Sequence, residues 1–492
     1  RPFYSPPNYP LVADKARMVG DYIALVVAET LTQAKDAAEA IDVDYEALPV
    51  VTIATEALRD GAPTIWDDNP DNICYYHEQG DKAAIEVAFE NAAHVVRQDL
   101  WINRVSANSM EPRGALGIYD PFEDRYTLYS GLQTPHRNRT DIANNILHIP
   151  ETKMRVVAND VGGSFGMKGG TYREQPLVLW AAKKVGRPVK WLSDRSEALL
   201  TDNHARDNQT AAELALDANG KMLGLRVKTV VNVGGQLSSR GPHSGIANLG
   251  TLSGTYVLPS IYVQVTGAFT NSGSTSAYRG AGRPEAAYVI ERMLDIAANK
   301  IKIDPAEIRR LNTIPPIGKP YDTGFIFTYD SGDFGKNMEI ALEMADYNGF
   351  ENRRVEAKAR GKLRGIGISN TIEQAAGKGY ESAQIRFSPT GSVTLLLGTI
   401  SHGQGHETVF TQVLCDQLGI DPTKVRVVEG DTDQVTMGTG TFGSRSAALA
   451  GSAIKLAADK VIDKAKTIAA HILEASTDDI EFAEGIFRIA GT

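Results

Sequence analysis

The sequence feature that most constrains this chain is a glycine-rich turn at residues 161–168, VGGSFGMK. It follows an apolar run at residues 154–158, which predicts a strand, and precedes a helix-like run at residues 171–185. Glycine lets the backbone adopt positive φ and approach another group closely. The free N–H groups at a helix start favour an anionic or polar ligand. The turn therefore predicts either a plain strand-to-helix connection or one wall of a ligand site.

Three further glycine-rich turns follow along the chain. They are residues 276–286 (SAYRGAGRPEA), 401–407 (SHGQGHE) and 438–447 (GTGTFGSRSA). The second of these lies between an apolar strand and an apolar helix, as the first turn does. Four such loops in one chain suggest a single extended ligand with several polar groups.

Length and composition restrict the possible partners. A chain of 492 residues is too long for one hydrophobic core, so we expect several domains. The net charge of −9 argues against a nucleic-acid or anionic-membrane partner, and no apolar run is long enough to cross a bilayer. Two distant cysteines without a C-x-x-C motif exclude a disulfide framework or a cysteine-ligated cluster within the chain. They fit a reducing compartment, and we expect the cytoplasm.

Apolar periodicity predicts an α+β fold of mixed sheets and helices. The predicted helices cover residues 31–41, 83–93, 171–185, 286–300, 334–360, 407–418 and 446–473. The predicted strands cover residues 18–28, 42–51, 94–105, 115–119, 125–130, 154–158, 189–192, 211–216, 222–232, 365–369, 382–387, 393–398 and 424–429. Polar stretches at residues 61–81 and 313–333 have little periodicity and predict linkers.

Other chemistries compete for the same loops. GGSFG at residues 162–166 satisfies the G-x-S-x-G nucleophile elbow, which would make Ser164 the nucleophile of a serine hydrolase. The histidines available to it, of which none has a distinctive setting, are His204, His243, His402, His406 and His471. A non-catalytic scaffold is the other alternative, although it would leave the four loops without a purpose.

Zinc and nucleotide sites have weaker support. His402 and His406 stand four residues apart, but the glycines between them would break the helix that must align two zinc ligands. A Walker sequence is absent because Gly169 follows Lys168, where Ser or Thr is required.

Together, the four loops resemble the molybdenum-binding large subunit of the xanthine dehydrogenase, aldehyde oxidase and carbon monoxide dehydrogenase family, in order and in approximate spacing, over essentially the whole chain. The resemblance implies a partial α/β hammerhead domain at residues 1–60 and a first molybdopterin-binding domain at 82–312. A second, truncated molybdopterin-binding domain would cover residues 334–492, with linkers at 61–81 and 313–333.

The resemblance also implies roles for particular residues. Gln133 and the Phe165-Gly166 pair match positions beside the oxygen and sulfur ligands of the metal, and Gln404 matches the glutamine that binds the pterin. The remaining implied cofactor-binding residues are Gly163, Ser164, Arg279, Gly443, Ser444 and Ser446, the serines as pterin or phosphate contacts. The substrate pocket would be formed by Phe165, Tyr278, Arg279 and Gly280. The molybdenum would be held through the pterin, with no direct protein ligand.

The implied activity is hydroxylation of an electron-poor carbon, with water as the oxygen source. The implied cofactor is molybdopterin with molybdenum, in bacteria commonly the cytosine dinucleotide form. Electrons would pass to a small iron–sulfur subunit carrying 2Fe-2S clusters and to a medium subunit carrying FAD, in a dimer of heterotrimers. These relatives oxidise small molecules rather than macromolecules.

At two positions the chain departs from motifs of particular family members, and these departures narrow the class of substrate. Carbon monoxide enzymes with copper carry a cysteine directly after the Tyr-Arg of the 276–286 loop, where this chain has Gly280. Xanthine enzymes place a substrate-binding glutamate directly after the lysine of the first loop, where this chain has Gly169. An aldehyde or an N-heterocycle remains.

The catalytic glutamate of the family lies in a Gly-Glu motif near the end of the second cofactor domain. No segment after Ser446 resembles that motif, so we expect the glutamate beyond residue 492 and no catalytic base within the chain. The chain is therefore expected to be a fragment that lacks both ends and does not turn over alone, since a general base contributes about 10²–10⁴-fold.

Overall fold

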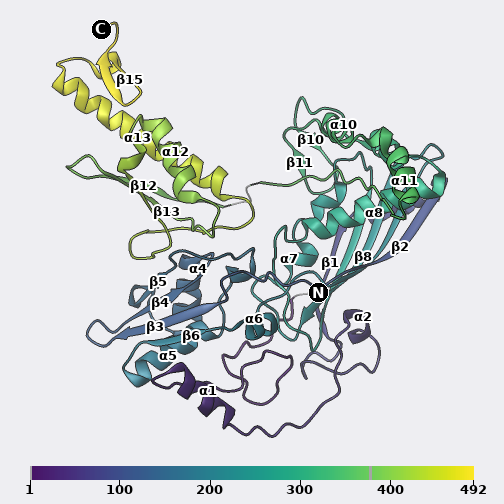
Figure 1. Ribbon diagram of the computed structural model, residues 1–492, viewed down its shortest axis with the longest axis horizontal. Helices are drawn as coiled ribbons and strands as arrows, with labels where there is room; N and C mark the ends of the chain where they lie inside the picture. Colours follow the sequence, from purple (N-terminus) through teal and green to yellow (C-terminus); the bar gives the residue numbers. More distant parts are fainter. Residues whose placement is uncertain (1–2, 376–378) are drawn as a thin grey trace. The chain divides into compact units, whose positions relative to one another are not determined.

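The computed structural model describes residues 3–375 and 379–492, which form two compact units (Figure 1). The first unit contains Arg1–Pro6, Leu48–Val105 and His204–Glu373. The second contains Pro7–Ala47, Ser106–Asn203 and Gln374–Thr492. Each unit combines segments that are distant in sequence. Residues 1–2 of the predicted hammerhead domain and residues 376–378 of the predicted second cofactor domain lie outside the described residues.

A five-stranded sheet is the centre of the first unit, in the order β1-β9-β8-β7-β2. Its strands are β1 (Ile73–Gly80), β2 (His94–Ile102), β7 (Asn208–Leu216), β8 (Met222–Gly234) and β9 (Ile261–Phe269). All neighbours are antiparallel except β8 and β9, and Leu214 stands opposite Leu225 in the β7–β8 register. Helix α8 (Arg283–Ile301) shares one hydrophobic core with the sheet through residues such as Met293 and Leu294.

Shorter elements complete the first unit. They are α2 (Ala54–Ala57), α3 (Lys82–Glu90), α7 (His243–Ile246), α9 (Pro305–Asn312), β10 (Tyr321–Asp322), β11 (Thr328–Tyr329), α10 (Phe334–Met344) and α11 (Phe350–Ala359). The single helix predicted at residues 334–360 is thus two helices. Asp346 takes a positive φ of 44° between them, and its carboxylate accepts from the Gly349 N–H at 3.2 Å, which ends one helix before the next begins.

Two sheets organise the second unit. The first has the order β5-β4-β3-β6, built from β3 (Gly114–Asp120), β4 (Arg125–Ser130), β5 (Met154–Val157) and β6 (Val189–Leu192). Helix α5 (Glu174–Val185) packs on β3. A Cβ at Gly117 would lie 2.6 Å from the Val178 backbone, so this close approach requires glycine.

The other sheet has the order β12-β13-β14, from β12 (Ala383–Phe387), β13 (Val393–Leu397) and β14 (Val425–Val428). Helices α12 (His406–Leu418) and α13 (Ser446–Ile472) share a core with it through Leu395, Phe410 and Ile454. The remaining elements are α1 (Leu31–Glu39), α4 (Pro135–Thr140), a π-helix at Asp141–Leu147, α6 (Arg195–Thr201), β15 (Ile480–Ala483) and β16 (Ile486–Ile489).

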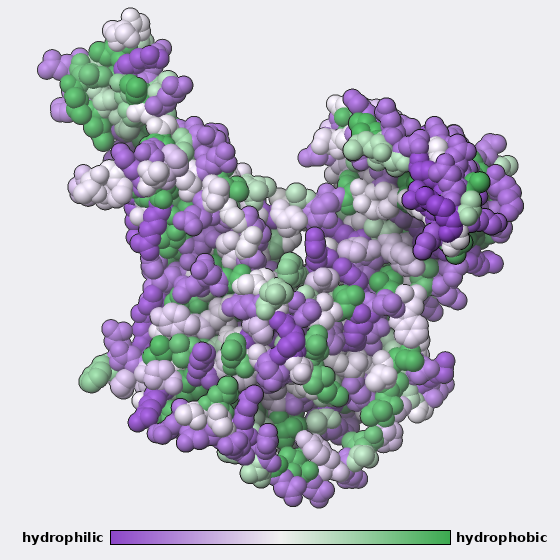
Figure 2. Space-filling view, in the orientation of Figure 1, coloured by the Kyte–Doolittle hydropathy of each residue, from purple (hydrophilic) through white to green (hydrophobic). Residues whose placement is uncertain are grey.

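The surface mixes hydrophilic and hydrophobic residues, as Figure 2 shows for one face. Exposed apolar residues occur on the last helix, where Ile468 is 51% and Ile472 is 70% exposed. Within the part of the chain that is described, no helix combines the length and hydropathy needed to span a membrane.

The α+β fold predicted from the sequence is confirmed, but several elements differ. The strands predicted at residues 18–28, 42–51 and 365–369 are wrong, because these segments pair with no strand among the described residues. An apolar run becomes a strand only where a partner completes its hydrogen bonds. The helix predicted between the segments 18–28 and 42–51 is present as α1, and Thr30 and Gln33 form a capping box at its start. The stretch predicted as a linker at 61–81 contains β1, and the one at 313–333 contains β10 and β11.

Candidate functional site

Gln133 joins two of the glycine-rich loops in the second unit. It follows the end of β4 by three residues, and its side chain is buried. Its amide oxygen accepts from the Ser164 hydroxyl and from the Gly166 N–H at 2.9 Å. Its amide nitrogen donates to the Thr441 carbonyl at 2.8 Å. One buried amide therefore fixes the loop at 161–168 against the loop at 438–447, and keeps one N–H for a further acceptor.

The loop at 161–168 has an unusual backbone. Gly163, Phe165 and Gly166 have φ values of 93°, 57° and 110°. Phe165 has no glycine freedom, and a bulky residue at positive φ is strained unless its surroundings hold it there. Its ring is 49% exposed, so the loop presents an aromatic face outward from a backbone that Gln133 anchors.

A partly buried ion pair supports the same loop. The Lys168 ammonium, 1% exposed, lies 2.7 Å from the Glu111 carboxylate, which also accepts from the Gly162 N–H at 2.8 Å. Burial lowers the pKa of Lys168, although the hydrogen bond and charge of Glu111 oppose the shift. Because the carboxylate binds both ends of the loop, it restricts where the loop can move.

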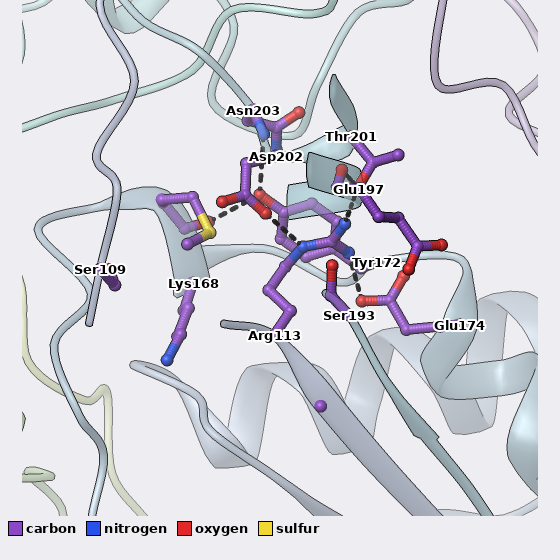
Figure 3. A network of polar contacts seen from close by, with 12 residues as sticks. Ser109, Arg113, Lys168, Tyr172, Glu174, Ser193, Glu197, Thr201, Asp202 and Asn203 are labelled. Atoms are coloured by element: carbon purple, nitrogen blue, oxygen red, sulfur yellow. Dashed lines mark hydrogen bonds and ion pairs between the residues drawn. The ribbon is translucent and has the colours of Figure 1, made fainter. Parts of the chain in front are cut away.

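Behind this loop lies a network of buried charges around Arg113 (Figure 3). The Arg113 guanidinium donates to Asp202 at 2.7 Å, to Thr201 and to Glu174. It also stacks 3.9 Å over the ring of Tyr172, whose hydroxyl donates to the Met167 carbonyl at 3.0 Å. Burial would lower the pKa of Arg113, but the carboxylates of Glu174 and Asp202 contribute to raising it well above its usual value.

The loop at 438–447 leads into the longest helix. Gly440 at φ 93° packs against the Gln133 carbonyl, only 2.2 Å from where its Cβ would stand, so only glycine fits. Ser444 has φ 56°, and the Ser446 hydroxyl lies 3.0 Å from that of Thr441. The buried Arg445 binds Glu381 at 2.6 Å and the Gly440 carbonyl at 2.7 Å.

The start of α13 is open to a ligand. Arg445 occupies the cap position, and no side chain of the described chain caps the helix there. A Cβ on Gly443 would meet no described atom within 4 Å. Uncapped N–H groups at the positive end of a helix favour a phosphate or another anion.

Gln404 lies on the loop at 401–407, and its side chain is exposed. Its amide oxygen accepts from the His402 N–H, so the side chain folds back on its own loop. Added Cβ atoms on Gly403 and Gly405 would meet nothing described within 4 Å, which leaves room beside Gln404.

The two histidines of this loop differ. Burial, with His406 and Lys168 nearby, lowers the pKa of His402 to about 4, and its Nε2 has no hydrogen-bond partner among the described residues. His406 is buried, and its Nδ1 lies 3.0 Å from the Glu429 carboxylate.

The loop at 276–286 belongs to the first unit. Arg279 is exposed, and Tyr278 and Gly280 are partly buried. Gly280, Ala281 and Gly282 have φ values of 95°, 46° and 95°. A Cβ on Gly280 would stand 2.4 Å from the Pro284 ring, so this turn is built for glycine.

The geometry does not support the rival chemistries. The Ser164 hydroxyl donates to the amide of Gln133 and accepts from the Lys168 N–H at 3.1 Å, whereas a hydrolase serine donates to a base. Within residues 3–375 and 379–492, no three His, Cys, Asp or Glu side chains are placed to hold a metal ion.

A cofactor with a polar ring system and a phosphate fits the loops of the second unit. The remaining N–H of Gln133, the unsatisfied Nε2 of His402 and the uncapped helix start are donors that such a group could use. Gln404, Gly443, Ser444 and Ser446 are the residues that would hold it, together with the backbone of 163–166.

Sequence reasoning missed the supporting residues. Glu111, Arg113 and Glu381 were not singled out, although each makes buried contacts with a glycine loop or its neighbours. The signal available was weak: Glu111 and Arg113 stand in MEPRG, a short charged stretch at residues 110–114.

Profiles of known protein families match most of the chain. The molybdopterin cofactor-binding domain profile matches residues 65–313, and a second profile of the same description matches residues 340–492. The aldehyde oxidase and xanthine dehydrogenase a/b hammerhead domain matches residues 3–49.

Three relatives are similar along nearly the whole chain. The carbon monoxide dehydrogenase large chain of Hydrogenophaga pseudoflava is 37% identical over 511 residues, covering 98% of this chain and 63% of the relative. The 6-hydroxypseudooxynicotine dehydrogenase complex subunit gamma of Paenarthrobacter nicotinovorans is 34% identical over 491 residues, covering 99% and 61%. The structure of quinoline 2-oxidoreductase from Pseudomonas putida 86 has a TM-score of 0.90 at 32% identity, covering 98% and 63%.

This chain thus spans less than two thirds of the length of these relatives. Because the cofactor-binding profile covers residues 65–313, about half of the sequence, the likeness is not confined to one motif. The chain belongs to the family of molybdenum-binding large subunits that includes xanthine dehydrogenase, aldehyde oxidase and carbon monoxide dehydrogenase.

Proposed function

We propose that this chain is the molybdopterin-binding part of a hydroxylase that oxidises an aldehyde or an N-heterocycle with water as the oxygen source. The observation that carries the proposal is the buried Gln133 amide, which joins two glycine-rich loops and keeps one N–H for a ligand. Family membership supplies the cofactor class, and the loops supply donors that suit it.

The residues of the chain would bind and orient the cofactor. Gln404 would bind the polar edge of the pterin, while Gly443, Ser444 and Ser446 would receive a phosphate at the start of α13. Gln133 and the backbone at 163–166 would lie beside the metal. The chemistry that the group supplies when bound is a two-electron oxidation of carbon with oxygen from water.

We propose substrate contacts for Phe165 of the second unit and for the 276–286 loop of the first unit, as the family resemblance implies. An exposed aromatic ring on an anchored backbone suits a flat substrate, because stacking needs a fixed face. Tyr278 and Arg279 would add an aromatic face and a positive charge. Gly280 carries no thiolate, and its strained turn does not accept a cysteine side chain without rearrangement, so we propose a site without copper.

The names of the relatives, together with Gly169, indicate which class of substrate we propose. One is named for quinoline and another for 6-hydroxypseudooxynicotine, and the absence of a carboxylate at Gly169 disfavours a purine. An N-heterocycle is therefore the first candidate and an aldehyde the second.

The electrons would leave through partner subunits. We propose a small iron–sulfur subunit with 2Fe-2S clusters and a medium FAD subunit, in a dimer of heterotrimers in the cytoplasm. The chain holds two distant cysteines, too few to bind such a cluster itself. The proposed pterin form is the cytosine dinucleotide.

Metal and nucleotide analysis of the native complex tests the proposal. Purified complex should contain molybdenum, iron and flavin, and acid hydrolysis should release CMP. Release of GMP with molybdenum present would correct the nucleotide form alone. Zinc without molybdenum would overturn the assignment as a whole.

A further inference from the structure

Arg206 connects three parts of the 276–286 loop in the first unit. Its guanidinium donates to the Arg279 carbonyl at 2.9 Å and to the Glu285 carboxylate at 3.1 Å. The same guanidinium lies 5.1 Å from the centre of the Tyr278 ring, over its face. Its side chain is 13% exposed, so most of this contact surface is shielded from water.

Glu285 extends this contact to the far end of the turn. While one carboxylate oxygen binds Arg206, the other accepts from the Gly282 N–H at 3.1 Å, at the start of α8. Its carboxylate is 6% exposed, and burial raises its pKa although the Arg206 charge opposes this. Arg206 and Glu285 therefore bracket the turn from Tyr278 to Gly282.

The turn between these contacts needs such support. Three consecutive residues, Gly280, Ala281 and Gly282, have positive φ, and Ala281 lacks the freedom of glycine. A cavity of about 30 Å³ is lined by Gly282 and Glu285 among others. A Cβ on Gly282 would stand 2.4 Å from the Ala247 carbonyl oxygen, so the turn leaves no room for a larger residue there.

Arg206 is itself held in a costly conformation. Arg206 and Asp207 have φ values of 64° and 66°, two successive non-glycine residues in the left-handed region. The Asp207 carboxylate accepts from Arg104 and from Asn232, each at 2.9 Å, and this stabilises the kink. Such strain persists where the surrounding structure over-determines it, and it is concentrated at functional sites.

We propose that Arg206 is a positioning residue that sets the conformation of the substrate loop and, through Tyr278 and Arg279, the affinity for a flat substrate. This rests on the proposed function of that loop. An Arg guanidinium can donate to two acceptors and stack on a ring at the same time, whereas a Lys ammonium cannot. Arg206 acts on the substrate through the loop, without touching it.

The variants separate charge from geometry. Arg206→Lys keeps a cation opposite Glu285 but loses the simultaneous contacts, and Arg206→Gln removes the charge as well. Arg310→Gln is the matched control, because Arg310 lies in the same unit and binds Glu339 at 2.6 Å, outside the loop. All are made in the full-length native complex.

Two measurements are made on each variant. Hydrogen exchange of the peptide covering 276–286 reports the loop directly, without substrate, and should become about tenfold faster in both Arg206 variants. With quinoline and benzaldehyde as probes, KM should rise about tenfold while kcat changes little and the molybdenum content stays constant. Arg310→Gln should match the wild type in both.

The outcomes are distinguishable. Unchanged exchange in 276–286 for Arg206→Gln would overturn the proposal, as would faster exchange spread evenly over the first unit with KM unaltered. If the wild-type complex lacks molybdenum and oxidises neither probe, the proposed function fails. The exchange of the loop still decides whether Arg206 positions it.

Discussion

Replacing Gln133 by leucine should loosen both glycine loops of the second unit. Leucine has a similar volume but no polar atoms. The Gly166 N–H and the Thr441 carbonyl would each lose a partner that now lies at 2.9 Å and 2.8 Å. The Ser164 hydroxyl would lose its acceptor as well.

The magnitude follows from these contacts. A buried group left without a hydrogen bond costs about 1–3 kcal/mol, so two backbone groups together cost roughly 2–6 kcal/mol. The Ser164 hydroxyl adds less, because it can rotate toward another acceptor. The local opening free energy of the two loops should therefore fall by roughly 2–6 kcal/mol.

Gln133→Glu gives a sharper test, because it keeps the acceptor and removes the donor. The carboxylate can still accept from Ser164 and Gly166, but it faces the Thr441 carbonyl with an oxygen. We expect only the loop at 438–447 to open more easily in this variant. Leucine should open both loops.

Native-state hydrogen exchange of peptides covering 161–168 and 438–447 measures the two openings separately. The molybdenum content of the same samples should fall with both variants. The control Gln98→Leu, a change at an exposed glutamine, should alter neither the exchange of the two loops nor the molybdenum content. If exchange in both loops stays at the wild-type rate in Gln133→Leu, the inference that this amide joins them is refuted.

Three further outcomes follow from the contacts around the site. Ser164→Ala should cost about 1 kcal/mol of loop stability and leave turnover of the native complex within a few-fold, whereas abolished turnover would revive the hydrolase alternative. Gln404→Ala should lower the molybdenum content of the purified complex, because a polar cofactor edge would lose its partner; full occupancy would contradict that role. The low pKa of His402, about 4, means that the unfolded chain binds more protons between pH 6.5 and 4, so stability is complete above pH 6.5 and falls as the pH drops toward 4. His402→Gln should flatten that part of a denaturation profile, and an unchanged slope would show that another group titrates there.

Much of the site could be read from the sequence because its signals are local. A glycine-rich turn between an apolar run and a helical run indicates its own position, and the helices after the turns at 161–168, 276–286, 401–407 and 438–447 are present. Gln133 follows the strand predicted at residues 125–130, and the structure has it three residues past β4. The roles of these residues toward a cofactor stay predictions.

Other parts could not be read because they depend on partners far along the chain. The apolar pattern predicts no strand at β9 and a linker at β1, although the two pair from Ile73 to Gly80 in the central sheet of the first unit. The apolar runs at 18–28 and 42–51 look like strands but pair with none of the strands described. Composition cannot tell these cases apart, because strand pairing is a property of two segments.

The contacts that hold the loop at 161–168 show the same difference between local sequence signals and dependence on distant residues. A turn with Phe165 at positive φ stores strain, and strain persists only if the surroundings exceed it. Apolar packing alone would hold such a turn loosely, because dispersion contacts have little directionality, whereas hydrogen bonds fix both distance and angle.

Here the fixing groups come from outside the loop. Tyr172 binds the Met167 carbonyl, and Arg113 stacks over Tyr172 while it binds Asp202, 89 residues away in sequence. Arg113 and Asp202 are buried and would be costly alone, so the cluster stabilises the turn only when it is complete. A glycine pattern can therefore reveal where a ligand-binding turn lies, while the charges that keep the turn in shape become visible only once the chain has folded.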